Sequence, residues 1–346
     1  CHDGSHQSRP PAISLQATEM GAIMTDPIEG PSSHRAWLFP GQGSQFVGMA
    51  ADLVEAHPVA RTVFDIASSK IGEDLLSICI EGPQSRLNRT EISQPAIFTA
   101  SMAVLRVLEQ SAGPSLLRAN ATAGLSLGEY SSLVFAGALR FEDALEVVVA
   151  RGQAMQRACD QVEGTMTTIL GLELPAVREA VESGKSAGIV AVANFNSSTQ
   201  FVISGERTAV ARASEAAREL GARRTVDLEV AGAYHSPLMA PATQELAPIL
   251  DRLPISAPKV AFYPNVLARP VTDPEQIREC LLKQVESSVL WEPTISALVA
   301  EGLEEVIEPG PGRVIAGLVK QVDRKVTTRS VLGRESVEEI LEGTVS

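Results

Sequence analysis

Paired cysteines, long apolar runs and an excess of basic residues are all missing from this chain of 346 residues. Its cysteines, Cys1, Cys79, Cys159 and Cys280, lie far apart, with no CxxC and no histidine at metal-ligand spacing. We therefore expect free thiols in a reducing compartment and no zinc site. No run approaches the ~18 apolar residues that a membrane helix requires. The net charge of −13 argues against nucleic acid as the main partner, because phosphate binding needs a basic face.

The first 34 residues are rich in Ser, Pro, Gly and His and show no helical or strand period. They have neither the basic start nor the apolar stretch of a secretory signal. Transit peptides are rich in arginine and poor in acids, whereas this segment has Arg9 against four acidic residues. We interpret residues 1–34 as an irregular leader, an upstream extension in which Met24 could be the natural start, and expect a cytoplasmic protein. The alternative is a remnant of a plastid or mitochondrial targeting signal.

The rest of the chain contains enough apolar material for a substantial interior. With 45% hydrophobic and 21% charged residues, it fits one large domain with a smaller companion, and not a disordered chain or a coiled coil. We predict that order begins at Ala36 with a buried strand over 36–39. Helices are predicted over 97–108, 127–136 and 142–157, and further strands over 121–124, 259–263, 305–308 and 326–331. This alternation favours an α/β fold whose parallel sheet is covered on both faces.

A different pattern occupies residues 159–230. Strands are predicted over 166–172, 189–195, 200–204 and 225–230, with helices over 174–182 and 209–220. The resulting β-α-β-β-α-β order is that of the split βαβ, or ferredoxin-like, unit. We therefore predict a main α/β domain of residues 35–158 and 231–346, interrupted by a ferredoxin-like subdomain of residues 159–230.

The stretch Gly124-Leu125-Ser126-Leu127-Gly128 matches the G-x-S-x-G pattern of a nucleophile elbow. A serine on a tight strand-to-helix turn takes disfavoured backbone angles, and flanking glycines remove the Cβ atoms that would collide there. The following helix directs its free N–H groups and its positive dipole end at the serine oxygen. Ser126 is therefore a candidate nucleophile, with an accidental glycine-flanked turn as the alternative.

A serine nucleophile needs a base, because a neutral hydroxyl attacks poorly. Three of the five histidines lie in the leader, and His57 follows a predicted helix end, where a surface position is expected. His235 follows a strand and a glycine-containing turn, which places it in a loop at a strand terminus, where α/β folds hold catalytic groups. His235 is the candidate base; the alternative is a histidine held by backbone contacts alone.

A second glycine loop, Pro40-Gly41-Gln42-Gly43-Ser44-Gln45, follows the first predicted strand. It lacks the Gly-Lys-Ser/Thr of a phosphate-binding Walker loop. It could present backbone or Gln42 amide groups to an oxyanion, or it could be a plain turn.

Six blocks of the sequence together resemble the signature of malonyl-CoA:acyl carrier protein transacylases, in family order and at family spacing from about residue 36 to 332. They are the residues 39–45, 124–130, 151–156, 194–196, 235–239 and 308–312. Each block alone is weak evidence, whereas the ordered set is highly specific. The resemblance implies a hydrolase-like α/β domain that carries a ferredoxin-like insert, in agreement with the pattern above.

The resemblance also implies a mechanism that needs no cofactor. Ser126 attacks the thioester of malonyl-CoA while His235 accepts its proton. The phosphopantetheine thiol of acyl carrier protein then discharges the malonyl-serine, in a ping-pong cycle that supplies fatty-acid synthesis. The positions of Gln42 and Leu127 match the backbone N–H groups that bind the oxyanion.

Two further positions take their roles from the resemblance. Arg151 matches the arginine that binds the malonyl carboxylate, a task suited to the guanidinium fork. From the sequence alone Arg151 would be an ordinary arginine on a helix surface. Gln284 matches the residue whose main-chain carbonyl orients the histidine, and no carboxylate completes the triad in that family.

The sequence departs from the family pattern beside both catalytic positions. Leu125 stands where many members have histidine, and Tyr234 stands where phenylalanine is usual. In related acyltransferase domains a serine at the latter position accompanies branched extender units, and a bulky aromatic accompanies malonyl. Leu127, in place of glutamine, points the same way, so malonyl is expected over methylmalonyl.

Acyl carrier proteins are acidic, as is this chain, so docking requires a local basic surface. The C-terminal segment 313–334 supplies six basic residues against one acid, Asp323. We predict docking near Arg313, Lys320, Arg324 and Lys325. A solvated helix face is the alternative. A monomer is expected from the family.

Three other functions stay open. The same elbow serves serine esterases and thioesterases, and Asp227 lies between Ser126 and His235 in their usual chain order. Against a hydrolase, no His-Gly-Gly-Gly segment is present and Arg151 would have no purpose. The second is an acyltransferase of a polyketide pathway, and the third is an inactive scaffold that binds carrier protein.

Overall fold

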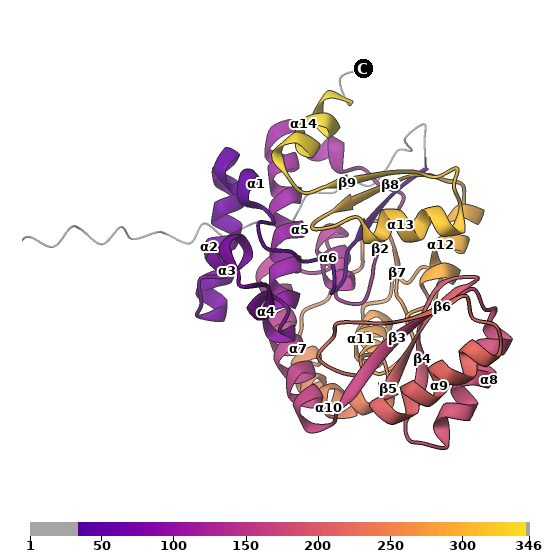
Figure 1. Cartoon of the computed structure of the whole chain (residues 1–346). Coiled ribbons are helices and arrows are strands. Elements are labelled where there is room, and N and C mark those ends of the chain that lie inside the picture. The colour runs from indigo at the N-terminus through magenta and orange to yellow at the C-terminus, as the bar shows by residue number, and fades with distance from the viewer. Residues whose placement is uncertain (1–33, 344–346) are drawn as a thin grey trace, which may run out of the picture.

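The computed structural model describes residues 34–343, and Figure 1 shows their arrangement. Five parallel strands form the larger sheet, in the order β7-β2-β1-β8-β9. They are β1 (His34–Phe39), β2 (Ala121–Gly124), β7 (Ala261–Tyr263), β8 (Leu303–Pro309) and β9 (Thr327–Val331). Because the strands are parallel, the loops that follow β1, β2 and β8 leave the sheet at the same edge.

Strand β1 is buried on both faces, which explains its run of apolar residues. Trp37 and Phe39 pack into one hydrophobic cluster, and Ala36 and Leu38 pack into another on the opposite face. The first cluster is covered by α5 (Thr90–Ala112), α6 (Gly128–Phe135) and α7 (Phe141–Gln161), and the second by α12 (Trp291–Ala300) and α13 (Val314–Val322). The sheet is therefore the middle layer of a three-layer α/β domain.

The remaining helices of this domain surround the first cluster. They are α1 (Ala51–Ala56), α2 (Pro58–Ile71), α3 (Leu75–Glu81), α4 (Gln84–Leu87), α10 (Ala240–Leu250), α11 (Pro274–Gln284) and α14 (Arg334–Glu342), with short 3-10 turns η1 (Pro114–Leu117) and η2 (Pro237–Met239). Within residues 34–343 no helix combines the length and the apolarity needed to span a bilayer. Cys79, Cys159 and Cys280 are buried free thiols, as predicted for these three.

The smaller sheet is antiparallel, with strand order β4-β5-β3-β6. Its strands are β3 (Gly164–Leu170), β4 (Val190–Ser197), β5 (Gln200–Glu206) and β6 (Arg224–Asp227). Helices α8 (Leu174–Lys185) and α9 (Arg207–Glu219) pack together on one face of it (Figure 1). This is the predicted split βαβ unit, and the predicted α/β fold class is confirmed. The proposed boundaries at residues 159 and 230 stay a prediction.

The two sheets are joined through the outer edge of β4. The N–H of Phe195 donates to the carbonyl of Val289 at 3.0 Å, and the N–H of Val289 donates to Ala193 at 2.8 Å. Val289 follows the end of α11 by five residues. The small sheet is thus attached to the segment that leaves α11 beside the candidate site.

Several predicted boundaries are wrong by a few residues. The helix predicted over 97–108 is α5, which runs from Thr90 to Ala112. Strand β1 begins at His34 and not at Ala36, because His34 still pairs with Leu303 of β8. Strand β6 ends at Asp227 and not at Val230, since the N–H of Val230 bonds back to the carbonyl of Leu228 in a tight turn. Apart from His34, the predicted leader lies outside the described residues.

Candidate active site

The candidate nucleophile lies on a sharp turn between β2 and α6. Ser126 has φ of 52°, a left-handed conformation that costs a non-glycine residue free energy. Gly124 and Gly128 lie so close together that a Cβ on Gly124 would overlap the backbone of Gly128. The two glycines therefore allow strand and helix to meet, and the turn holds the Ser126 hydroxyl at the edge of the sheet.

The loop after β6 brings His235 to this hydroxyl. Its Nε2 lies 2.8 Å from Ser126 Oγ, and its Nδ1 lies 2.8 Å from the main-chain oxygen of Gln284. A carbonyl only accepts hydrogen bonds, so Nδ1 carries the proton and Nε2 accepts from the serine. This is the tautomer that a general base requires.

Burial keeps His235 neutral. The ring is 5% exposed, and burial together with the positive charge of Arg151 lowers the pKa of His235 to about 4, against the smaller opposing effect of its backbone hydrogen bonds. A neutral imidazole is available to take up a proton at neutral pH.

Arg151 is buried in front of the nucleophile, on α7. Its Nη2 lies 3.0 Å from Ser126 Oγ and 2.8 Å from Gln284 Oε1, and its Nη1 lies 2.7 Å from Gln94 Oε1. The guanidinium also lies 5.8 Å from the centre of the Tyr130 ring. With 1% of its surface exposed, Arg151 is not the surface arginine that the sequence alone suggested. Helix α7 packs along α5 and turns this residue inward.

Gln284, the last residue of α11, contacts the candidate nucleophile, the candidate base and Arg151. Its main-chain oxygen accepts from His235, and its side-chain Oε1 accepts from Arg151. Its Nε2 donates to the main-chain oxygen of Ser126 at 2.8 Å and to Glu129 Oε2 at 2.6 Å. The residue is fully buried. Base, arginine and nucleophile are therefore held by a single side chain and its backbone.

The glycine loop after β1 lies against the elbow. A Cβ on Gly41 would overlap the carbonyl of Leu125, so glycine is needed for this close approach. In the described part of the chain, the backbone N–H groups of Gln42 and Leu127 donate to no other protein group. Leu127 precedes the first turn of α6, where the helix dipole is positive. These free donors could bind an oxyanion.

Three buried residues of this site were not predicted. Glu129 accepts from Gln284 and from the backbone N–H of Asn265. The Asn265 side chain accepts from the Ser126 N–H at 2.7 Å and donates to the carbonyl of Gly124 at 2.7 Å. Gln94 holds Arg151. Glu129 stood next to the elbow in the sequence, but nothing in the sequence placed Asn265 or Gln94 beside it.

The carboxylate needed for a hydrolase-type triad is not where chain order suggested. Asp227 is exposed and accepts from Thr167 Oγ1 at 2.7 Å, while Nδ1 of His235 is bonded to a peptide carbonyl. The hypothesis of a Ser126–His235–Asp227 triad is therefore wrong. His57 closes α1 away from these residues, and its N–H bonds to the carbonyl of Leu53.

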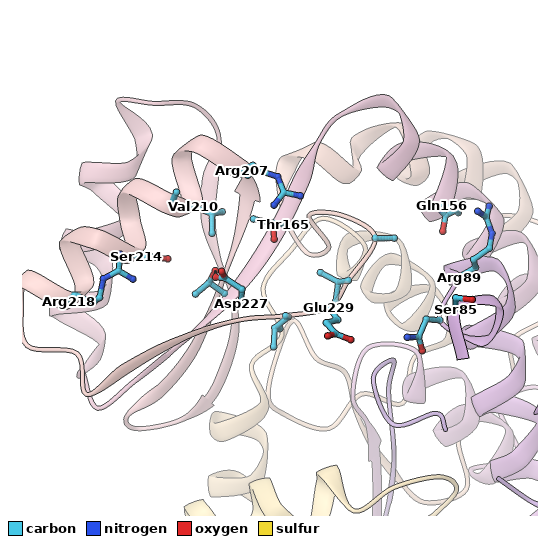
Figure 2. A pocket seen from close by; sticks show the side chains of 16 residues that line it. Ser85, Arg89, Gln156, Thr165, Arg207, Val210, Ser214, Arg218, Asp227 and Glu229 are labelled. Atoms are coloured by element: carbon cyan, nitrogen blue, oxygen red, sulfur yellow. The ribbon is translucent and has the colours of Figure 1, made fainter. Parts of the chain in front are cut away.

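A polar cavity of about 730 Å³ lies between the small sheet and the main domain. Figure 2 shows Arg207 and Thr165 on one side of it and Gln156 and Arg89 on the other. Ser126 and His235 do not line it. Hydrogen bonds connect it to Tyr234, the residue before His235. Gln156 accepts from the N–H of Thr90, whose hydroxyl lies 2.5 Å from the Tyr234 hydroxyl.

A serine in a strained turn, a histidine held against it and N–H donors without partners are groups that acyl transfer through a serine requires. In agreement, residues 36–336 match the family model described as the acyl transferase domain. Two malonyl CoA-acyl carrier protein transacylases are similar along most of their length. That of Bacillus subtilis is 43% identical over 88% of this chain and 95% of its own, and that of Escherichia coli is 39% identical over 86% and 95%.

Solved structures agree with these relatives. An acyl carrier protein S-malonyltransferase from Vibrio cholerae superimposes with a TM-score of 0.84 at 40% identity, covering 89% of this chain and all of its own. A malonyl-transacylase in complex with a type II PKS acyl-carrier protein gives a TM-score of 0.85 at 38% identity, with 90% and 100% covered. The chain belongs to the malonyl CoA-acyl carrier protein transacylase family.

Proposed function

We propose that this enzyme transfers the malonyl group from malonyl-CoA to the phosphopantetheine thiol of acyl carrier protein, for fatty-acid synthesis. Its curated relatives have this activity in their names. The proposal assigns Ser126 as nucleophile and His235 as base, with Gln42 and Leu127 as oxyanion donors. Arg151 binds the malonyl carboxylate, and Gln284 orients His235.

In the first half-reaction Ser126 Oγ attacks the thioester carbon and His235 Nε2 takes the hydroxyl proton. The carbonyl oxygen becomes an oxyanion that accepts from the N–H groups of Gln42 and Leu127, each worth ~3 kcal/mol of transition-state stabilisation in comparable sites. The C–S bond then breaks, and His235 gives its proton to the CoA thiolate. Malonyl-Ser126 and free CoA result.

The second half-reaction uses the same groups in reverse. His235 takes the proton of the carrier thiol, and the thiolate attacks the malonyl-serine carbonyl. The C–O bond to Ser126 breaks, and the serine oxygen recovers its proton from His235. The malonyl thioester of the carrier leaves, and the enzyme returns to its starting state.

The position of Arg151 is the observation that carries the proposal. The direct hydrogen-bond partners of this buried guanidinium, which lies 3.0 Å from the nucleophile, are all neutral, so an anion that reaches Ser126 can bind it directly. The free carboxylate of a malonyl group attached at Ser126 supplies that anion. An esterase of neutral substrates would gain nothing from Arg151.

Intact-protein mass after mixing with malonyl-, methylmalonyl- and acetyl-CoA tests the proposal. We expect a malonyl adduct on the wild-type enzyme, no adduct on Ser126→Ala, and loss of the malonyl preference in Arg151→Ala. Adding carrier protein with its phosphopantetheine should discharge the adduct. Rapid release of free malonate without carrier would show a hydrolase instead, and transfer by Ser126→Ala would show that Ser126 is not the nucleophile.

Selection of malonyl over methylmalonyl is assigned to Tyr234. The residue is buried, and its hydroxyl is fixed by Thr90 and by Gln42 Nε2 at 3.2 Å. A ring held in this way beside His235 leaves little room for a branched acyl group. Tyr234→Ser should therefore raise the rate of methylmalonyl adduct formation relative to malonyl.

Docking of the carrier protein is assigned to the surface around Arg313, Lys320, Arg324 and Lys325. Within residues 34–343 none of these four is ion-paired with a carboxylate, whereas Arg329 and Arg334 of the same segment are paired with Glu305 and Glu338. The loop before α13 also lies near the glycine loop of residues 40–45, the proposed oxyanion loop, since a Cβ added to Gly312 would lie 3.3 Å from Ser44. Exposed Phe46 and Val314 add apolar surface. Unpaired cations next to the acyl site suit an acidic partner that must insert its thiol there.

A further inference from the structure

Glu129 is a buried carboxylate to which the reaction described above gives no role. It lies on α6, three residues after the nucleophile, and is fully buried. Both of its oxygens are used, because Oε1 accepts from the Asn265 N–H and Oε2 accepts from Gln284 Nε2. Burial raises the pKa of Glu129 to about 8, against the lowering effects of these donors and of Arg151. Burying a carboxyl group costs free energy of folding, which suggests that Glu129 has a role in function.

The contacts of Gln284 show what Glu129 can do. A glutamine amide has one accepting end and one donating end, and it can rotate to exchange them. Arginine only donates, so the oxygen end must face Arg151. An ionised carboxylate only accepts, so Glu129 requires the amino end of the same amide on the opposite side. Glu129 therefore fixes Gln284 in the one orientation that offers an acceptor to Arg151.

The same arrangement leaves Arg151 open to substrate. Direct contact with a carboxylate would occupy the guanidinium fork and compete with the malonyl group. Here the nearest negative charge is separated from Arg151 by the Gln284 amide, which bonds to both. Where Glu129 is ionised, its charge offsets that of Arg151 without contact, and Nη2, which faces Ser126 Oγ, stays available to an incoming carboxylate.

We propose that Glu129 is a positioning residue that determines the preference for carboxylated acyl groups by holding Arg151 through the side chain of Gln284. This inference rests on the proposed function, because it assumes that Arg151 binds the malonyl carboxylate. It adds a second residue pair, Glu129 and Gln284, to acyl selection.

Glu129→Gln tests the inference, because it replaces the carboxylate by an amide of nearly the same size and shape. The new amide can accept from only one of its two neighbours. The Asn265 donor is a backbone N–H that cannot turn away, whereas the Gln284 amide can rotate, so Gln284 should turn its donor end toward Arg151. We expect the ratio of adduct-formation rates with malonyl-CoA and acetyl-CoA, measured above pH 8, to fall by about tenfold or more, as for loss of one hydrogen bond to a charged group. A purely structural role would slow both substrates equally and leave the ratio unchanged, which would overturn the proposal.

Glu308→Gln provides a matched control. Glu308 is also a fully buried carboxylate, and it accepts from the N–H groups of Ile315 and Ala316 at the start of α13. Its substitution should lower stability without changing the malonyl-to-acetyl ratio. A similar fall in the ratio for Glu308→Gln would show that the effect comes from general destabilisation.

Gln284→Met tests separately whether the side chain of Gln284 links Glu129 to acyl selection. This test does not depend on the stability of Glu129→Gln. Methionine keeps the main-chain carbonyl that accepts from His235, but it removes both the amide oxygen that faces Arg151 and the amide nitrogen that faces Glu129. We expect the same fall in the ratio, and no further fall in the double variant, because residues that act through one contact are non-additive. An unchanged ratio in Gln284→Met, or losses that multiply in the double variant, would overturn the proposal. Failure of the wild-type enzyme to form any malonyl adduct would instead refute the proposed function.

Discussion

His235 is oriented by a peptide carbonyl where many serine enzymes use a carboxylate. The main-chain oxygen of Gln284 fixes the tautomer, but it adds no negative charge to stabilise an imidazolium. Arg151 nearby makes the protonated ring still less favourable. His235, the proposed base, is therefore weakly basic, and its ring stays neutral well below pH 6.5.

A pH titration of stability checks this property. The unfolded chain takes up a proton on this histidine near pH 6.5, whereas the folded protein resists it until about pH 4. The free energy of unfolding should therefore fall as the pH drops from 6.5 to 4, by about 3 kcal/mol from this residue. Denaturant unfolding at several pH values measures it, and adduct formation from malonyl-CoA should persist below pH 6.5 while the chain stays folded.

His235→Gln is the control for that titration. The variant loses activity, and its unfolding free energy should lack this part of the decline between pH 6.5 and 4. An activity midpoint near pH 6.5, or equal declines in both proteins, would contradict a buried neutral histidine.

Motif residues of this site could be predicted, and residues placed by tertiary contact could not. Ser126 and His235 stand in recognisable local contexts, a glycine-flanked turn and a loop after a strand. Nothing in local sequence separates Arg151 from a surface arginine, because its burial depends on how α7 lies against α5. Asn265 and Gln94 are polar residues without a motif, and they are brought to the site by the fold alone.

The turn that carries Ser126 is held in place because the backbones of β2 and α6 are in contact there. Gly128 is packed so tightly that a Cβ there would overlap the carbonyl of Phe39, at the end of β1. Strand, turn and helix therefore form one rigid unit, and the serine is held in its strained conformation by this packing.

A pair of glycine substitutions tests the rigidity of this unit. Gly128→Ala should lower the free energy of unfolding by about 3 kcal/mol or more, because neither backbone can move aside easily. In Gly317→Ala, on the exposed face of α13, the new Cβ meets no atom within 4 Å. This substitution should raise the free energy of unfolding by ~0.5–1 kcal/mol through helix propensity. Denaturant unfolding of both variants measures the effects, and equal stabilities would contradict the close contact.

The spacing of apolar residues and the glycine and proline breaks located most helices and strands. They did not predict where each element ends or which strands lie side by side in the sheet. The apolar run 36–39 identified β1, but the first residue of the strand depends on pairing with β8. The order β7-β2-β1-β8-β9 brings together strands more than a hundred residues apart, and no local pattern encodes it. The split βαβ unit was easier, because its strands pair within one short segment.

The whole molecule carries an excess of negative charge, −13, yet its proposed partner is an acidic protein. Long-range repulsion must then be overcome where α13 meets the oxyanion loop. The four basic residues of this surface lack carboxylate partners within residues 34–343, so their field is not cancelled locally.

Reversing two of these charges tests the docking surface. Lys320→Glu with Arg324→Glu should raise the apparent KM for carrier protein several-fold and leave the KM for malonyl-CoA unchanged, because the change lies outside the acyl site. A matched reversal of the exposed Arg61 on α2 and Arg178 on α8 keeps the net charge of the variant and should have little effect. Equal changes in both double variants would show that net charge, and not this surface, controls docking.

The sharing of Gln284 has a consequence for engineering. Replacing Arg151 to admit neutral acyl groups also removes the hydrogen-bond donor to Gln284 Oε1. Gln284 is also the residue whose main-chain oxygen orients His235. Under the proposed roles, acyl selectivity and turnover both depend on Gln284 and should fall together in single-site variants. Recovering both calls for libraries that vary positions 129, 151 and 284 at once.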